Sequence, residues 1–207
     1  FGAGGALIGL IFAVFSAMQF LFSPFWGRLS DRIGRRPVLL ITLAGGVIAY
    51  AIFAYASMLS GKQGLWLLLA SRVFAGICGG NIGVAQAYIA DISPPEKRSA
   101  RMGLIGVAFG LGFIVGPIIG SFSGKYGQAT PGWVATALCA ANFLLACAVL
   151  PESRKPGARP AESRPRWNQW VETLRRPKVG LLIVLFFLAT LCFASYETTL
   201  ALLAKQL

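Results

Sequence analysis

Long uncharged apolar runs alternate with short charged stretches along the chain. Six runs are long enough to cross a bilayer as helices, because a hydrocarbon core about 30 Å thick needs roughly 20 helical residues. They cover residues 2–26, 38–59, 66–90, 101–123, 133–150 and 179–204. None of them alternates polar with apolar positions, as a membrane-spanning strand would. The pattern predicts an all-α protein, a polytopic membrane helix bundle.

Composition favours the same class over a soluble domain. Of the 207 residues, 56% are hydrophobic and 13% are charged, whereas soluble domains carry about a quarter charged residues. Arg72 and Glu197 are the only charged residues that lie inside the six runs and away from their ends. These two residues therefore need a specific explanation.

The net charge of +12 is concentrated in every second connection between the runs. Of the 19 lysines and arginines, 15 lie in 27–37, 91–101 and 151–178, whereas the intervening connections hold Lys62 and Lys125. An excess of basic residues marks the cytoplasmic loops of a membrane protein. The charge therefore indicates topology in a cell membrane, with the basic loops cytoplasmic, and not a nucleic-acid partner.

The connection 151–178 has a composition unlike the rest of the chain. Its five prolines and eight basic residues do not bury a core and are typical of a flexible linker. We expect a membrane half at 1–150 that lacks its first helix, a cytoplasmic linker at 151–178, and the first helix of a second half at 179–207. Since Phe1 opens inside an apolar run without a signal-peptide pattern, we expect an internal piece of a longer protein.

Three motifs in order along the chain carry a resemblance to a known family. Gly27-x-x-x-Asp31-Arg32-x-Gly34-Arg35-Arg36 resembles motif A of the major facilitator superfamily of transporters, and Arg72-x-x-x-Gly76 resembles its motif B. Gly112-Phe-Ile-Val-Gly116-Pro117-Ile-Ile-Gly120 resembles motif C of its proton-coupled drug exporters, and Leu150-Pro151-Glu152-Ser153 is similar to the ending that precedes their central loop. The resemblance implies the major facilitator superfamily fold, with this chain equivalent to helices two to seven of twelve.

The charged stretch 27–37 contains more than a topology signal requires. Its arginines alone would satisfy the charge bias, but Asp31 and the glycines would remain unexplained. Gly27 and Gly34 allow a tight turn, and Asp31 can face the positive N-terminus of a helix in the other half of the protein, an interaction worth about 0.3–2 kcal/mol. A contact this weak suits a switch, since about 1.4 kcal/mol changes a two-state ratio tenfold.

The resemblance implies the same switching role for this stretch. It implies a cytoplasmic gate made of Gly27, Asp31, Arg32, Gly34, Arg35, Arg36 and Asp91, in which Arg35 bonds both aspartates. The alternative is a topology anchor with no further role.

Arg72 lies inside an apolar run, where a central arginine costs about 2.5–3.5 kcal/mol and usually finds a partner or a wet cavity. At 100° per residue, Gly76 and Gln86 fall on the same helical stripe as Arg72. Two hypotheses stay open: the stripe faces a cavity and governs proton movement, or small residues pack helices with Arg72 as a polar anchor. Asn81 points away from the stripe, and we expect it to form an interhelical hydrogen bond.

The fourth apolar run carries glycines and a proline in a regular pattern. Small residues allow close approach of neighbouring helices, and proline removes a backbone donor and bends a helix. The resemblance implies a sealing and hinge role, without chemistry, for Gly112, Gly116, Pro117 and Gly120.

The chain offers little for metal or cofactor binding. It has no histidine, and its four cysteines lie at no metal-ligand spacing. We therefore expect no metal and no cofactor. The expected partners are a small-molecule substrate, protons, the lipid bilayer and the remainder of the same transporter chain.

These observations predict a secondary transporter that works by alternating access. Proton-coupled export of small amphipathic or cationic compounds such as drugs is the favoured function, and a proton-coupled uptake symporter is the nearest alternative. A membrane enzyme or a receptor is a more distant one, because Asp31, Asp91 and Glu96 are not arranged as a metal cluster and no catalytic residue is expected.

Glu197 is the single acid inside an apolar run, where the surroundings favour the uncharged form of a carboxyl group, as a proton carrier requires. It lies roughly 27 Å from the start of its helix, towards the outer interface. Gln19 and Asn142 are weaker candidates for cavity residues.

In the intact transporter we expect Glu197→Gln to shift the pH dependence of export, measured as dye accumulation in inverted vesicles. An unaltered pH profile would remove Glu197 as the proton carrier.

Overall fold

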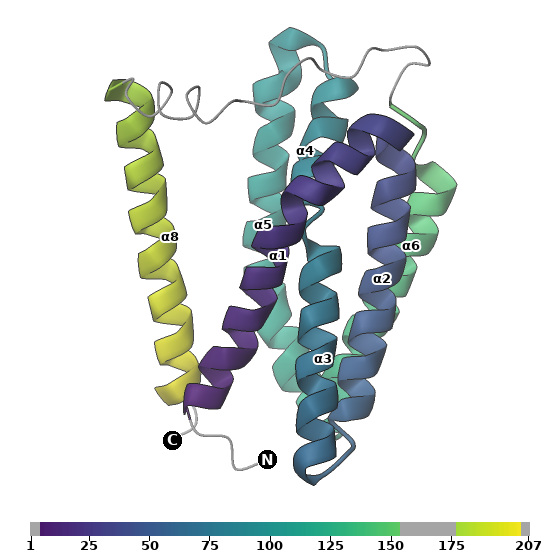
Figure 1. Ribbon diagram of the computed structural model, residues 1–207, viewed down its shortest axis with the longest axis vertical. Coiled ribbons are helices and arrows are strands. Elements are labelled where there is room, and N and C mark those ends of the chain that lie inside the picture. The colour runs from purple at the N-terminus through teal and green to yellow at the C-terminus, as the bar shows by residue number, and fades with distance from the viewer. Residues whose placement is uncertain (1–4, 154–176, 204–207) are drawn as a thin grey trace. The chain divides into compact units, whose positions relative to one another are not determined.

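The computed structural model of the protein describes residues 5–153 and 177–203, and the chain divides into two compact units, 1–158 and 159–207. The first unit contains α1 (Gly5–Ile33), α2 (Arg35–Ala56), α3 (Gly61–Gly79), α4 (Ile82–Asp91), α5 (Pro95–Gly124) and α6 (Thr130–Val149), and the second contains α8 (Pro177–Leu203) (Figure 1). Within the described residues each of the six apolar runs is mainly helical, so the all-α prediction is confirmed. Most of the predicted linker 151–178 lies outside the described residues, and the division into two halves stays a prediction.

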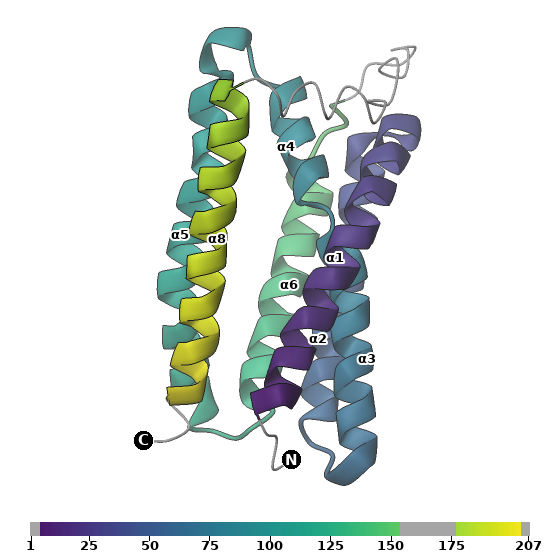
Figure 2. The same cartoon turned by 60° about the vertical axis from the view of Figure 1, so that its left-hand side comes forward.

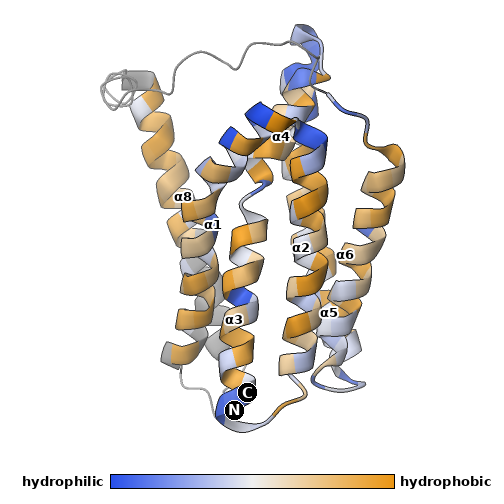
Figure 3. Ribbon diagram, turned by 45° about the vertical axis from the view of Figure 1, so that its right-hand side comes forward, coloured by the Kyte–Doolittle hydropathy of each residue, from blue (hydrophilic) through white to orange (hydrophobic). Residues whose placement is uncertain are grey.

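Five helical stretches of the described chain are long and apolar enough to cross a membrane. They are Gly9–Ile33, Arg35–Ala56, Gly61–Asp91, Pro95–Gly124 and Thr130–Val149. These helices are mostly hydrophobic along their length, and hydrophilic residues gather where α1 meets α2 (Figure 3). Large apolar side chains such as Phe20 and Trp66 are exposed on the surface, as expected of helices that face lipid. The protein is a multi-pass membrane protein.

Within the first unit, α3 packs against both α1 and α2, and α2 packs against α6 (Figures 1 and 2). Small residues set these approaches. A Cβ atom added to Gly76 would lie 2.5 Å from the carbonyl oxygen of Phe15 in α1, and one added to Gly132 in α6 would lie 2.9 Å from the Cα atom of Ala54 in α2. Helices this close exclude any larger side chain at the contact, as is typical of membrane bundles.

An apolar cluster of buried residues lies close to the junction of α1 and α2. Its buried members come from α1, α2 and α4 and are Trp26, Val38, Leu39, Val84 and Tyr88. The three helices that carry the charged motif residues are therefore held together by apolar packing immediately beside those charges. The packing fixes the backbone from which the charged side chains extend.

The run predicted as one helix over 66–90 consists of two helices, so the prediction of a single helix is wrong. α3 ends at Gly79 and α4 begins at Ile82. Each glycine weakens a helix by about 1 kcal/mol relative to alanine, and Gly79 and Gly80 stand together. A Cβ atom on Gly80 would lie 3.0 Å from the backbone nitrogen of Ser23, so the glycine also allows α1 to approach the break.

Side chains of α1 donate hydrogen bonds to the carbonyls beside this break. Trp26 Nε1 donates to the carbonyl of Ile77 at 2.6 Å, and Gln19 Nε2 donates to the carbonyl of Gly79 at 3.0 Å. A carbonyl without a donor inside an apolar span costs several kcal/mol. The interruption of the helix is therefore stabilised by α1, and Gln19 is engaged in this contact.

Trp26→Phe should destabilise the protein by about 1–3 kcal/mol, because it leaves the carbonyl of Ile77 without its donor. Thermal unfolding in detergent micelles measures the change. Trp66→Phe is the matched control, since Trp66 is 70% exposed whereas Trp26 is 8% exposed. Equal melting temperatures for the two variants would contradict this account of the break.

Candidate functional site

A single residue separates α1 from α2. Gly34 has φ 107° and its amide donates to the carbonyl of Ser30 at 3.1 Å, a left-handed conformation that glycine adopts without a steric penalty. A Cβ atom there would also lie 2.5 Å from a carboxylate oxygen of Glu152. Position 34 therefore requires glycine for its backbone conformation and for the space beside it.

Gly27 does not take part in the turn. It lies inside α1, and no described residue would come within 4 Å of a Cβ atom added there. The prediction that it forms a tight turn is wrong, because the helix continues through it to Ile33. Gly27 contributes its carbonyl, which accepts a hydrogen bond from the hydroxyl of Ser30 at 2.8 Å.

Arg35 joins three helices with one guanidinium group. Its Nη1 lies 2.6 Å from Asp31 Oδ1 and donates to Ser30 Oγ at 2.6 Å, while its Nε donates to Asp91 Oδ2 at 3.2 Å. We call Asp31, Arg35 and Asp91, with the hydroxyl of Ser30, the ionic cluster. The structure thus brings together at one end of the bundle the three charged residues that the motif resemblance implies.

The ionic cluster lies at the surface. The side chain of Arg35 is 16% exposed, whereas those of Asp31 and Asp91 are 43% and 36% exposed. Ion pairs open to solvent contribute roughly 0.2–1 kcal/mol each. The cluster can therefore bias the packing of α1, α2 and α4 without making it permanent.

The segment after α6 reaches the same place, which sequence reasoning did not predict. Glu152 accepts hydrogen bonds from the backbone amides of Arg35 at 3.0 Å and Arg36 at 3.2 Å. Ser153 Oγ lies 3.5 Å from Asp91 Oδ2 and so reaches the ionic cluster. The sequence signal for this contact was the acid Glu152 among the basic residues of 151–178, but no local pattern indicates that it meets α2.

Two further arginines of the predicted gate, Arg32 and Arg36, lie in different surroundings. Arg36 Nη2 donates to the carbonyl of Cys147 in the last turn of α6 at 3.1 Å. Arg32 lies on an exposed part of the last turn of α1. Arg36 therefore belongs to the contact between α2 and α6, whereas Arg35 holds α1 and α4.

Arg72 lies over aromatic rings of the neighbouring helix. Its guanidinium carbon is 4.3 Å from the ring centroid of Phe53 and 5.4 Å from that of Tyr50, both in α2. Its Nη2 atom is buried and has no hydrogen-bond partner among the described residues. A buried donor of this kind is costly, so the aromatic faces are the main stabilising surroundings that the described residues provide.

The stripe of Arg72, Gly76 and Gln86 is interrupted by the break between α3 and α4. Gly76 packs against the backbone of α1, as the packing hypothesis proposed. The side chain of Gln86 is exposed, and in the part of the chain that the structure describes no hydrogen bond joins it to Arg72. The structure therefore does not bring Arg72 and Gln86 into one site.

A cavity of about 150 Å³ lies among α1, α2, α3 and α6. Tyr50 lines it together with Thr42 and Asn81, and Asn81 Nδ2 donates to Thr42 Oγ1 at 2.8 Å. The predicted interhelical hydrogen bond of Asn81 is confirmed. The cavity therefore has a polar wall near the aromatic residues that hold Arg72.

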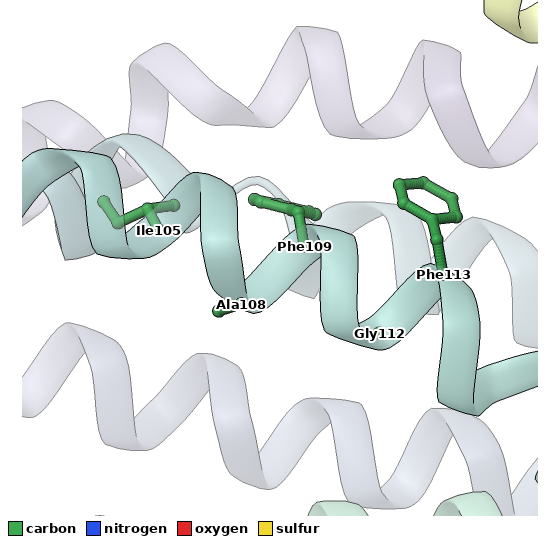
Figure 4. Close-up of a pocket in the computed structure, with 5 residues that line it drawn as sticks. All are labelled: Ile105, Ala108, Phe109, Gly112 and Phe113. Carbon is green, nitrogen blue, oxygen red and sulfur yellow. The ribbon is translucent and has the colours of Figure 1, made fainter.

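The motif C residues lie on an open part of α5. No described residue would come within 4 Å of a Cβ atom on Gly112, Gly116 or Gly120, and the helix continues through Pro117. An apolar groove of about 450 Å³ follows the same helix, where Ile105, Phe109 and Phe113 project to one side (Figure 4). These glycines therefore pack against nothing in the described chain.

Glu197 lies within α8, but its side chain is outside the described residues.

Comparison with known proteins matches the family model of the Major Facilitator Superfamily to residues 1–207. The chain is 43% identical over 156 residues to the tetracycline resistance protein of class C from Escherichia coli, which covers 75% of this chain and 38% of that protein. It is 38% identical over 184 residues to the class E protein from Escherichia coli, covering 87% of this chain and 44% of the relative. It is also 41% identical over 151 residues to major facilitator superfamily domain-containing protein 10 from Bos taurus, covering 73% of this chain and 31% of that protein.

The chain spans less than half of the length of each of these relatives. The family model nevertheless extends over the whole chain, and the relatives exceed 30% identity over more than two thirds of it. The helices, the charged turn at Gly34 and these matches lead to one conclusion: the chain belongs to the Major Facilitator Superfamily.

Proposed function

We propose that the chain is part of a secondary active transporter that works by alternating access and exports small amphipathic or cationic compounds in exchange for protons. The observation that carries the proposal is the ionic cluster, which joins three helices at one end of the bundle through solvent-accessible ion pairs. Relatives named as tetracycline resistance proteins support a drug-like substrate.

Alternating access requires one end of the bundle to close and open again. With each exposed pair worth roughly 0.2–1 kcal/mol, the ionic cluster favours one packing by an amount that differential substrate or proton binding can reverse. The concentration of basic residues in 27–37, 91–101 and 151–178 supports a cytoplasmic position for this end. In this proposal the ionic cluster is part of the cytoplasmic gate, together with Gly34 and Arg36.

Polar groups deeper in the bundle are proposed to serve protons and substrate. Arg72 has a buried donor without a partner among the described residues, and a water molecule or an anionic group would relieve that cost. Binding of protons or substrate by Gln86 and Glu197 stays a prediction, since Gln86 is exposed and the side chain of Glu197 lies outside the described residues. The open face of α5 with Gly112 and Gly116 is proposed to face the remainder of the transporter.

Asp31→Asn in the intact transporter should lower turnover by up to about fivefold, because it removes the charge that pairs with Arg35, a partly exposed pair worth at most about 1 kcal/mol, and so weakens the closed state. Dye accumulation in inverted vesicles, divided by the amount of protein in the membrane, measures the effect. Glu96→Gln is the control, since Glu96 is an exposed acid in the first turn of α5. Export by Asp31→Asn at the wild-type rate would overturn the gate.

Arg72→Lys should lower export by at least about threefold, since an ammonium group does not lie flat over the rings of Phe53 and Tyr50 as a guanidinium does. Arg98→Lys, at an exposed position in α5, controls for the change from arginine to lysine. The same vesicle measurement applies to both variants. If the two variants export equally well, the aromatic site of Arg72 has no role in transport.

A further inference from the structure

The first turn of α2 is hydrogen-bonded by the carboxylate of Glu152, which is distant from it in the sequence. One oxygen of Glu152 accepts from the amide of Arg35 at 3.0 Å, and the other accepts from the amide of Arg36 at 3.2 Å. The first amides of a helix have no partner within the helix, and they carry its positive dipole end. Glu152 satisfies two of these amides and places a negative charge beside that end.

The same two segments also exchange a contact in the reverse direction. Arg36 Nη2 donates to the carbonyl of Cys147 at 3.1 Å, in the last turn of α6 where carbonyls lack helical donors. The hydroxyl of Tyr88 in α4 donates to the carbonyl of Pro151 at 3.1 Å and fixes the residue before Glu152. We call Glu152, Arg36 and the carbonyl of Cys147 the α2–α6 clamp, in which each segment caps the other helix.

The α2–α6 clamp and the ionic cluster share one residue. The amide of Arg35 is bound by Glu152, while its guanidinium group binds Asp31 and Asp91. Ser153, next to Glu152, also reaches Asp91 at 3.5 Å. Any shift of Glu152 therefore changes the backbone from which Arg35 extends, as well as one contact of its acidic partner.

We infer that Glu152 is a positioning residue of the gate: its carboxylate holds the first turn of α2 against the end of α6 and so keeps Arg35 between Asp31 and Asp91. The inference rests on the proposed function, because it deepens the role of the same ionic cluster. It also explains the glycine at position 34, since the carboxylate of Glu152 occupies the space that a side chain there would fill.

The two-oxygen geometry suggests a nearly isosteric test. Glutamine keeps the length of Glu152 but presents an amide nitrogen to one of the two amides and carries no charge, so it loses one hydrogen bond and the attraction to the helix end. In the intact transporter, Glu152→Gln should lower kcat about three- to tenfold and leave KM within about twofold. Glu96→Gln again serves as the control, because it removes an acid at a different helix start.

A double variant separates a positioning role from general damage. Since Glu152 and Asp31 act on the same Arg35, the combination of Glu152→Gln with Asp31→Asn should export no more slowly than the worse single variant. Dye accumulation in inverted vesicles, corrected for protein amount, provides the rates. Losses that multiply in the double variant, or a normal kcat for Glu152→Gln, would overturn the inference.

A second measurement does not depend on transport. Thermal unfolding of the purified transporter in detergent should show a smaller shift for Glu152→Gln with Arg35→Lys than the sum of the two single shifts. Additive shifts would overturn the positioning role even in an active protein. Should the wild-type protein fail to export the dye, the proposed function fails and this cycle still decides the role of Glu152.

If Glu152→Gln does not accumulate in the membrane, Arg36→Met replaces it, because it removes the other arm of the clamp.

Discussion

Every backbone amide and carbonyl inside an apolar span needs a hydrogen-bond partner from the protein, and this constraint shapes the whole chain. Continuous helix satisfies it along most of the first unit. Where α3 stops within the span, at Gly79, side chains of α1 satisfy it instead: Trp26 and Gln19 donate to the carbonyls of Ile77 and Gly79. The helix break is thus a property of two helices together.

At the end of the bundle, charged groups provide partners for the terminal backbone groups of two helices. Glu152 accepts from the first amides of α2, and Arg36 donates to a carbonyl in the last turn of α6. Arg35 extends from this capped backbone and pairs with two partly exposed aspartates. The ion pairs of Arg35 are made by its side chain and the caps by other groups, so the side-chain contacts can be exchanged without the helices losing their caps.

Particular residues show how far the sequence leads. The apolar runs gave the helices to within a few residues at most ends, since hydropathy and length are local properties. They did not predict the break at Gly80, where the apolar pattern continues but the helix is interrupted. Gly34 and Gly27 look equivalent in the motif, yet only Gly34 has a left-handed conformation, because α1 runs through Gly27 without interruption.

The sequence by itself determined the membrane class, the all-α fold and the charge bias of the loops, because these follow from the summed hydropathy and charge of neighbouring residues. Only the tertiary structure decided which donors serve the break beside Gly79, which rings hold Arg72, and that Glu152 meets the amide of Arg35. The last two residues are separated by 117 positions. A hydrogen bond is effective only over about 3 Å and in one direction, so the relative placement of distant helices, which no local pattern specifies, decides whether it forms.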